Sequence, residues 1–598
     1  MQLVFVRPIL AIAAIFLSLA NLASASSDKL IYERSENQWY MSWRIPMSVS
    51  PDGSWALFHG GPENMHLYSI RAGSEENETL TKGMDVVEDA AFCGSGSSSL
   101  ARRGRRGSET GWFFPGEEHV SSLPAQVTLA CSQDGRKIAY FDSSAPDRKL
   151  FVGSQGNYRP YSPAGTVTAM AFSADARMFY YLAYDSNAET TLFRIVLSTG
   201  EPQAVVNHLD ASRLANNIAL APDGKSAYLT LASDSFPENA ARHQPHAARW
   251  LKIYQVDFAT GTRRLVVDSP GENNASPALA AGFLYWNHKV IQDTIVTIPT
   301  EGGVAKNVIA GGAFPMWNPD GSQIGYFFGD LRFADLPLNF DDAVVNVDAN
   351  ANRTSEPRVI VSGYGEDFPP AWSPDGKWIA FHSHRSPTPV PTYASPGTTD
   401  DVFLRRANDV HAPEIRLTDF GLETGPAYWS PDGKKLIFVS WKRGGTPGIN
   451  KLWVLTLDTE KGAVLKTEML PLSEDILNPS AGMWSPDGKE IAIEDDRGER
   501  RSTLWVVRAD GSHPEKVIDY EGTTYGGLDW ERDGKTLIYS GLAGDHLQLF
   551  SVPRIGGTPT QLTHDVGDLL QPEVSPDGKR IACFREVQSN QIWRRSLP

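Results

Sequence analysis

The chain has 598 residues, about three times the length that one hydrophobic core needs, so it should form several domains or a repeat array. Hydrophobic residues at 41% and charged residues at 21% exclude wholesale disorder, and 52 Gly with 40 Pro indicate frequent turns. The chain has 71 Asp and Glu against 55 Lys and Arg. The resulting net charge of -16 argues against nucleic-acid binding over the whole surface.

Residues 1–25 have the pattern of a secretory signal peptide. Arg7 precedes an apolar run over residues 9–22, and small residues lead to Ala25. No later stretch approaches 18 apolar residues, so we expect no transmembrane segment. No cysteine follows the leader closely, which argues against a lipid anchor. The sequence therefore predicts a soluble protein that is periplasmic or secreted.

The chain has three cysteines, Cys93, Cys131 and Cys583. An odd number in an exported protein argues against a disulfide framework and leaves at most one bridge. We therefore expect the fold to depend on its hydrophobic cores.

The dominant signal is an internal repeat, whose clearest copies of Trp-Ser-Pro-Asp-Gly begin at Trp372, Trp429 and Trp484. The Asp residues of these and seven related turns are Asp52, Asp134, Asp175, Asp223, Asp320, Asp375, Asp432, Asp487, Asp533 and Asp577. The gaps before Asp134 and before Asp320 are nearly twice as long as the others. Each should hide a drifted unit, the first around residues 91–96 and the second with strands at 283–286 and 294–298. The count becomes about twelve units.

Each unit follows one local pattern. Pro presets the φ angle of a type I turn, Asp suits the next position, and Gly takes a left-handed φ, so the motif predicts a hairpin between two strands. A third strand often carries its own Trp, as at Trp453 and Trp505, and a fourth precedes the next unit. Helical periodicity is weak beyond the leader. Four short strands per unit are typical of a β-propeller blade.

The Trp-Ser-Pro-Asp-Gly-Lys turn, the Ile-Ala-Phe strand and the closing Arg-Leu-Thr or Gln-Leu-Thr resemble the TolB-like propeller repeat. The resemblance implies an all-β fold of tandem β-propellers with about twelve four-stranded blades, in two rings of about six. We expect a first propeller over 26–305 and a second over 306–598. If residues 30–33 complete the last blade, one ring is inserted into the other. Related propellers bind proteins, accompany peptidases or amidohydrolases, or occasionally act as lyases.

In such a fold, the loops entering the first strand and those joining the second to the third strand open on one face, which we call the loop face. The Ser-Pro-Asp-Gly turns lie on the opposite face, the turn face. Long loops at 233–248, 329–342 and 383–401 favour the loop face as the functional one. The charged residues predicted there as contacts for a protein or peptide partner are Asp367, His384, Arg385, Lys442, Arg443, Asp495, Asp496 and Arg497. Salt bridges between neighbouring blades would also account for these charges.

An enzymatic alternative is a polysaccharide-acting lyase or hydrolase with its site in a propeller funnel. His382 and His384 lie two apart on a strand, but two ligands do not make a metal site. No nucleophile elbow, His-Glu-x-x-His motif or phosphate loop occurs. We therefore predict a non-enzymatic binding protein with no cofactor, no metal and no catalytic residue, whose partner lies in the cell envelope or outside the cell.

Overall fold

The computed structural model describes residues 28–36, 47–50, 55–60, 66–71, 77–79, 86–93, 100–106, 109–115, 119, 121–124, 127–142, 148–154, 156–185, 189–209, 217–232, 251–268, 273–280, 282–328, 341–361, 367–383, 400–409, 411–419, 421–441, 450–498, 501–522, 527–544 and 546–597. Its regular elements there are all β-strands. In these residues no helix is long and apolar enough to cross a membrane. The predicted signal peptide lies outside the described residues.

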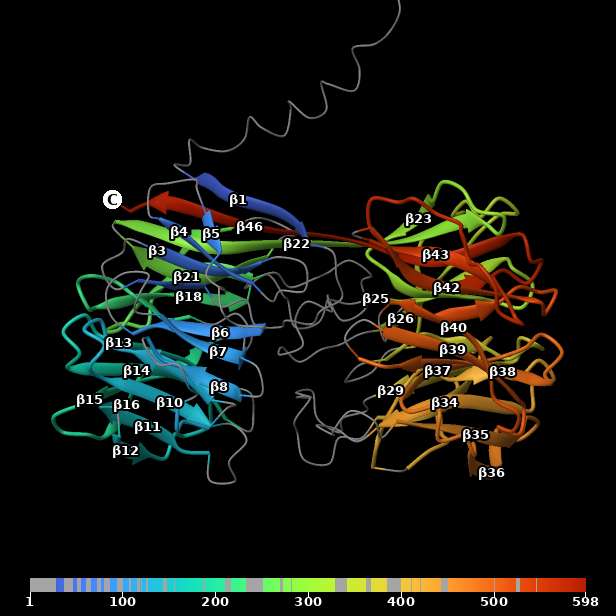
Figure 1. Cartoon of the computed structure of the whole chain (residues 1–598), viewed down its shortest axis with the longest axis horizontal. Coiled ribbons are helices and arrows are strands. Elements are labelled where there is room, and N and C mark those ends of the chain that lie inside the picture. The colour runs from blue at the N-terminus through green and yellow to red at the C-terminus, as the bar shows by residue number, and fades with distance from the viewer. Residues whose placement is uncertain are drawn as a thin grey trace, which may run out of the picture.

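The strands form two lobes that lie side by side (Figure 1). Eleven antiparallel sheets occur in the described part of the chain, and most have four strands. The sheets that belong to the first lobe alone are β2–β5 (Met47–Val49, Trp55–Gly60, His66–Arg71, Asn77–Thr79), β6–β8 (Val86–Phe92, Leu100–Arg106, Glu109–Phe113), β9–β12 (Val127–Cys131, Ile138–Asp142, Leu150–Ser154, Asn157–Tyr161), β13–β16 (Thr166–Phe172, Met178–Tyr184, Thr190–Val196, Pro202–Leu209) and β17–β20 (Ala219–Leu220, Ser226–Ala232, Leu251–Asp257, Arg263–Val267).

The second lobe has the same plan. Its own sheets are β24–β27 (Ala313–Trp317, Gln323–Phe328, Asp341–Asn346, Arg358–Val361), β28–β31 (Ala371–Trp372, Trp378–Ser383, Asp401–Arg406, Ile415–Arg416), β32–β36 (Glu423–Thr424, Tyr428–Trp429, Lys435–Trp441, Lys451–Asp458, Ala463–Met469), β37–β40 (Pro479–Trp484, Glu490–Asp496, Arg501–Arg508, Glu515–Glu521) and β41–β44 (Leu528–Trp530, Thr536–Ala543, His546–Pro553, Thr560–Gln561).

The remaining sheet belongs to both lobes. Its centre is a pair of long antiparallel strands, β22 (Phe283–Pro299) and β46 (Arg580–Ser596). In the first lobe they are flanked by β21 (Asn273–Ala280) and β1 (Lys29–Glu36). In the second lobe β23 (Lys306–Ala310) and β45 (Asp568–Val574) take the flanking places. The boundary that we expected near residue 305 therefore lies inside this shared sheet.

The shared sheet corrects one strand prediction. Residues 283–286 and 294–298 were expected to be two strands, but both belong to β22. No turn separates these two segments, because β22 continues from the first lobe into the second. There it pairs with the other end of β46. The N-terminal strand β1 pairs with β46, with Leu30 opposite Trp593.

The Ser-Pro-Asp-Gly turns share one hydrogen-bond network. In the turn after β28, Ser373 Oγ donates to Asp375 Oδ1 at 2.7 Å, and Lys377 N donates to the same oxygen at 3.1 Å. Trp378 N donates to Ser373 Oγ at 3.0 Å. Gly376 has a φ of 69°, as the hairpin requires. The motif therefore conserves its Ser and Asp because both side chains bond to the backbone of the turn.

The core lies between adjacent sheets rather than at one centre. In one such layer Ala380 and Leu404 of one sheet pack against Leu436 and Phe438 of the next. All four side chains are buried. Packing each sheet against its two neighbours is the arrangement expected of propeller blades.

In the second lobe, three of the Trp residues that end a first strand also hydrogen-bond to a neighbouring sheet. Trp429 Nε1 donates to Ala371 O at 3.0 Å, and Trp530 Nε1 donates to Met483 O at 3.1 Å. Trp317 Nε1 donates to Glu573 O at 3.2 Å, which joins β24 to β45. The first and last sheets of this lobe are thus linked by the same kind of bond as two pairs of its consecutive sheets.

Candidate functional site

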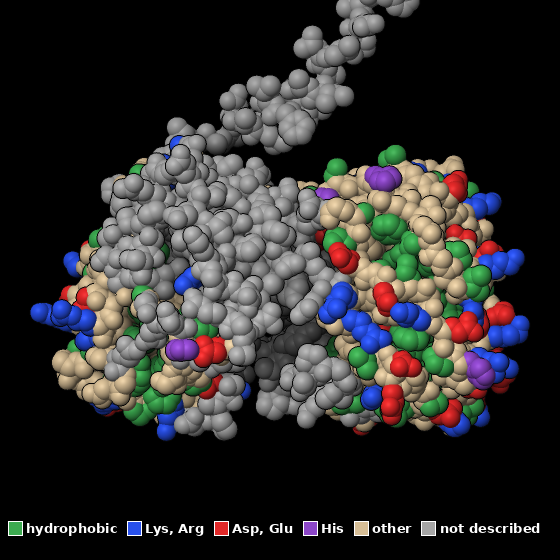
Figure 2. Space-filling model, in the orientation of Figure 1, with side chains coloured by type: hydrophobic (Ala, Val, Ile, Leu, Met, Phe, Trp, Pro, Cys, Tyr) green, Lys and Arg blue, Asp and Glu red, His purple; other side chains and the backbone are tan. Residues whose placement is uncertain are grey.

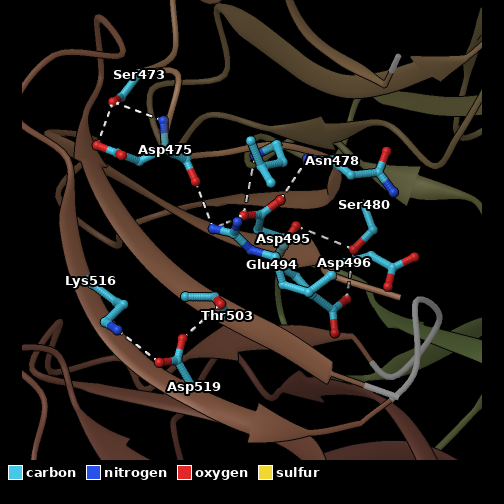
Figure 3. Close-up of polar contacts among 12 residues, drawn as sticks. Ser473, Asp475, Asn478, Ser480, Glu494, Asp495, Asp496, Thr503, Lys516 and Asp519 are labelled. Carbon is cyan, nitrogen blue, oxygen red and sulfur yellow. Dashed lines mark hydrogen bonds and ion pairs between the residues drawn. The ribbon is translucent and has the colours of Figure 1, made fainter. Parts of the chain in front are cut away.

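The predicted partner contacts lie where second strands end and approach loops begin. In the second lobe, Asp495 is the penultimate residue of β38 and is 0% exposed. Its carboxylate accepts hydrogen bonds from Asn478 N at 2.6 Å and Leu477 N at 3.3 Å (Figure 3). Burial raises the pKa of Asp495, while these backbone bonds and the charge of Arg497 act in the opposite direction. Asp495 therefore fixes the approach loop to the end of β38.

Arg497 extends this link. Its Nη2 lies 2.7 Å from Asp495 Oδ2 and donates to Asp475 O at 2.6 Å. The side chain is 26% exposed, so it reaches solvent while holding the loop. Asp496 is half-buried, and its Oδ1 accepts a hydrogen bond from Gly498 N at 2.8 Å. Asp496 and Arg497 are thus the two predicted contacts in this blade that a partner can reach.

Asp367 has a role like that of Asp495. It lies in the approach loop before β28, is buried, and accepts a hydrogen bond from Ser383 Oγ at the end of β29 at 2.5 Å. In the shared sheet, Arg585 lies within β46, and its Nη1 forms an ion pair with Oδ2 of Asp565, in the approach loop before β45, at 3.3 Å. Asp367, Asp495 and Arg585 thus hold approach loops against second strands.

The other predicted contacts, His384, Arg385, Lys442 and Arg443, lie outside the described residues. In the sequence they follow directly after β29 and β34. The neighbouring His382 is buried and packs against Phe368, with ring centroids 4.2 Å apart. The described residues contain no group of three or more His, Cys, Asp or Glu side chains arranged to hold a metal ion.

No sequence pattern indicates that Glu494, next to Asp495, is buried. Tyr520 Oη donates to its Oε1 at 2.6 Å, and Ser480 Oγ lies 3.3 Å from its Oε2. Burial raises the pKa of Glu494 to about 8. Short strands that are covered on both faces do not alternate in polarity, so no pattern could have separated Glu494 from the half-buried Asp496 that follows in the same strand.

A second buried acidic feature lies on the innermost strands. Asp529 precedes Trp530 and accepts hydrogen bonds from Trp530 N and Val574 N, both at 2.7 Å. The bond to Val574 joins β41 to β45. Burial raises the pKa values of Asp529 and Glu573, and the charge of Asp529 raises that of Glu573 further. In the sequence, both residues could be found by their position, because each directly precedes the last residue of the first strand of its unit, β41 or β45.

No protein-family model matches the chain. A segment of 151 residues, 25% of the chain, is 32% identical to an uncharacterized peptidase, YuxL of Bacillus subtilis, and covers 20% of that protein. Another of 174 residues, 28% of the chain, is 29% identical to the uncharacterized protein Atu1656 of Agrobacterium fabrum and covers 52% of it. The matched segments thus span from a fifth to a half of these relatives.

Solved structures with a similar arrangement include TolB proteins. One from Agrobacterium tumefaciens is 18% identical, covers 50% of this chain and 99% of its own, and has a TM-score of 0.36. TolB from Acinetobacter baumannii is 15% identical, covers 58% of this chain and 82% of its own, and has a TM-score of 0.34. An oligogalacturonate lyase with manganese is 13% identical, covers 80% of this chain and 97% of its own, with a TM-score of 0.28. The predicted fold class is confirmed: the described residues are all-β and form repeated antiparallel sheets, most of them four-stranded, as in a β-propeller.

Proposed function

We propose that the protein is an exported, non-enzymatic propeller that binds a protein or peptide partner through the loop face of its second lobe. The observation that carries the proposal is the linkage of approach loops to second strands by Asp367, Asp495 and Arg585. Such links give the rim of the face a fixed shape, and binding sites are commonly loops held on a rigid scaffold.

Within this proposal the predicted contact residues have two roles. Asp367 and Asp495 are buried and position the loops. Asp496 and Arg497 contact the partner, together with His384, Arg385, Lys442 and Arg443, which follow second strands in the neighbouring blades. The arginines bind carboxylates of an anionic segment, since a guanidinium holds a carboxylate by two parallel hydrogen bonds.

A disulfide supports export. Cys93 and Cys131 are bonded, whereas Cys583 is a buried thiol. Disulfides form and persist in oxidising compartments and are rare in the cytosol. Together with the leader-like sequence of residues 1–25, the bond supports a periplasmic or secreted location.

Charge reversal on the two faces tests the proposal. The double variant Arg385→Glu with Arg443→Glu is expected to lose at least about ten-fold of the partner captured from an envelope extract at low salt, because long-range attraction between opposite charges is lost. The matched control reverses Lys377 and Lys434 on the turn face, where Lys377 pairs with Asp375 and is 67% exposed. Capture lost only in the control pair would show that the turn face binds the partner instead.

A further inference from the structure

The two lobes are joined by β22 and β46, which pair without interruption from Phe283 opposite Ser596 to Pro299 opposite Arg580. Each strand has a different place in each lobe. We count the strands of each blade outward, with the innermost strand as the first. In the first lobe β22 is the second strand and β46 the third, whereas in the second lobe β46 is the second strand and β22 the third. Both strands therefore leave one lobe on its loop face and enter the other on its loop face. The loop faces of the two lobes are thus turned toward each other, on the inner sides of the lobes in Figure 1.

The shared sheet is narrowest between the lobes. On the β22 side, β21 pairs as far as Lys289 and β23 begins to pair at Thr294. On the β46 side, β45 pairs as far as Glu586 and β1 begins to pair at Gln588. The sheet therefore narrows from four strands to three at residues 290, 291 and 293 of β22, and to two strands at the pair Gln292–Val587.

The narrowest part of such a sheet is its most deformable part, because narrow sheets twist more than wide ones. The lobes on either side are stiffer, because each sheet there packs against its neighbours.

We propose that residues 290–293 and 586–589 form a hinge about which the two lobes open and close, so that their loop faces approach and separate. The inference depends on strand pairing and direction and not on the identity of the proposed partner. Motion about the hinge moves the sheets farthest from it the most. In Figure 1 these include β11 and β12 of the first lobe and β35 and β36 of the second.

Distances between spin labels on the full-length oxidised protein test the hinge. Ser162→Cys, just after β12, and Lys451→Cys, the first residue of β35, place exposed labels on opposite lobes. The native cysteines do not compete, since two are bonded and Cys583 is buried. The control pairs lie within one lobe: Ser162→Cys with Ser198→Cys, and Lys451→Cys with Glu521→Cys.

We expect the distance distribution across the lobes to be at least about twice as broad as those within a lobe. Val587→Gly should broaden it further, because Gly in a strand frees the backbone, and should leave the control pairs unchanged. The matched substitution Thr191→Gly in β15 should not broaden it. A cross-lobe distribution as narrow as the controls would refute the hinge. An unchanged width in Val587→Gly would show that the motion is not centred on this narrowest part of the sheet.

Discussion

The two lobes join their neighbouring sheets by different bonds at the same place. In the second lobe a Trp ends the first strand of most sheets, and three of these residues, including Trp429 and Trp530, donate the indole N–H to a neighbouring sheet. In the first lobe Cys131 takes the Trp position and forms a disulfide with Cys93, which directly follows β6 of the neighbouring sheet. The comparison shows that one seam between blades can be held by a buried aromatic ring or by a covalent bond.

The largest expected effect comes from removing a Trp of the second lobe. Trp530→Ala deletes a fully buried side chain and its bond to Met483 O, and large-to-small changes of aromatic residues cost about 3–5 kcal/mol. We expect the free energy of unfolding of the second lobe to fall by this amount, measured by denaturant titration. The control, Trp453→Ala, removes a half-buried Trp whose indole donates to Ser440 Oγ within its own sheet. An equal loss in both variants would contradict a special role for the seam.

Removing the disulfide should have the next largest effect, and it should act on the first lobe. The bond closes a loop of 38 residues, for which chain-entropy arguments give about 3–4 kcal/mol. We expect Cys131→Ser to lower the thermal midpoint of the first lobe, and a reductant to do the same to the wild type. Cys583→Ser serves as the control that removes a thiol without breaking a bond. A midpoint that is insensitive to reductant would count against the seam assignment.

Glu494 should make the second lobe less stable as the pH rises. Its pKa is near 8 in the folded protein against 4.5 for the free side chain, so folding favours the protonated form. The free energy of unfolding should therefore fall between about pH 5 and pH 8 and then level off. Glu494→Gln should reduce this decline and leave the part that is due to Asp529 and Glu573, with a gain over the wild type of at least about 1 kcal/mol at pH 9. A decline that persists unchanged in Glu494→Gln would assign the pH dependence to other groups.

The smallest effect is expected at the turns. Gly433 has a φ of 68°, and a methyl group there would meet only Pro374 Cδ at 3.5 Å. Gly433→Ala should therefore cost about 1 kcal/mol through backbone strain rather than through a clash. Lys434→Ala, at the exposed neighbouring residue, is the control for a surface change. A denaturation midpoint shared by both variants would contradict the hairpin geometry.

Local sequence rules predicted most of the strands, since the repeated turn marks where each hairpin begins. They could not predict that β22 runs through two lobes, because strand ends are set by the pairing partner, and β46 lies almost 300 residues away. The partner of Cys131 was left open for the same reason. At the site, the motif placed Asp367 and Asp495 on the loop face, but their burial depends on the folding of approach loops that carry no fixed pattern. The number of blades and the division into two propellers stay predictions.

Hydrogen exchange followed peptide by peptide tests most directly whether the two seams are separate. One data set compares the wild type with and without reductant, and the other compares it with Trp530→Ala. We expect reductant to speed exchange in β6–β12 of the first lobe and Trp530→Ala to speed it in β37–β45 of the second, with little change in the opposite lobe. If either change speeds exchange equally in both lobes, the disulfide and the tryptophans do not act on separate seams.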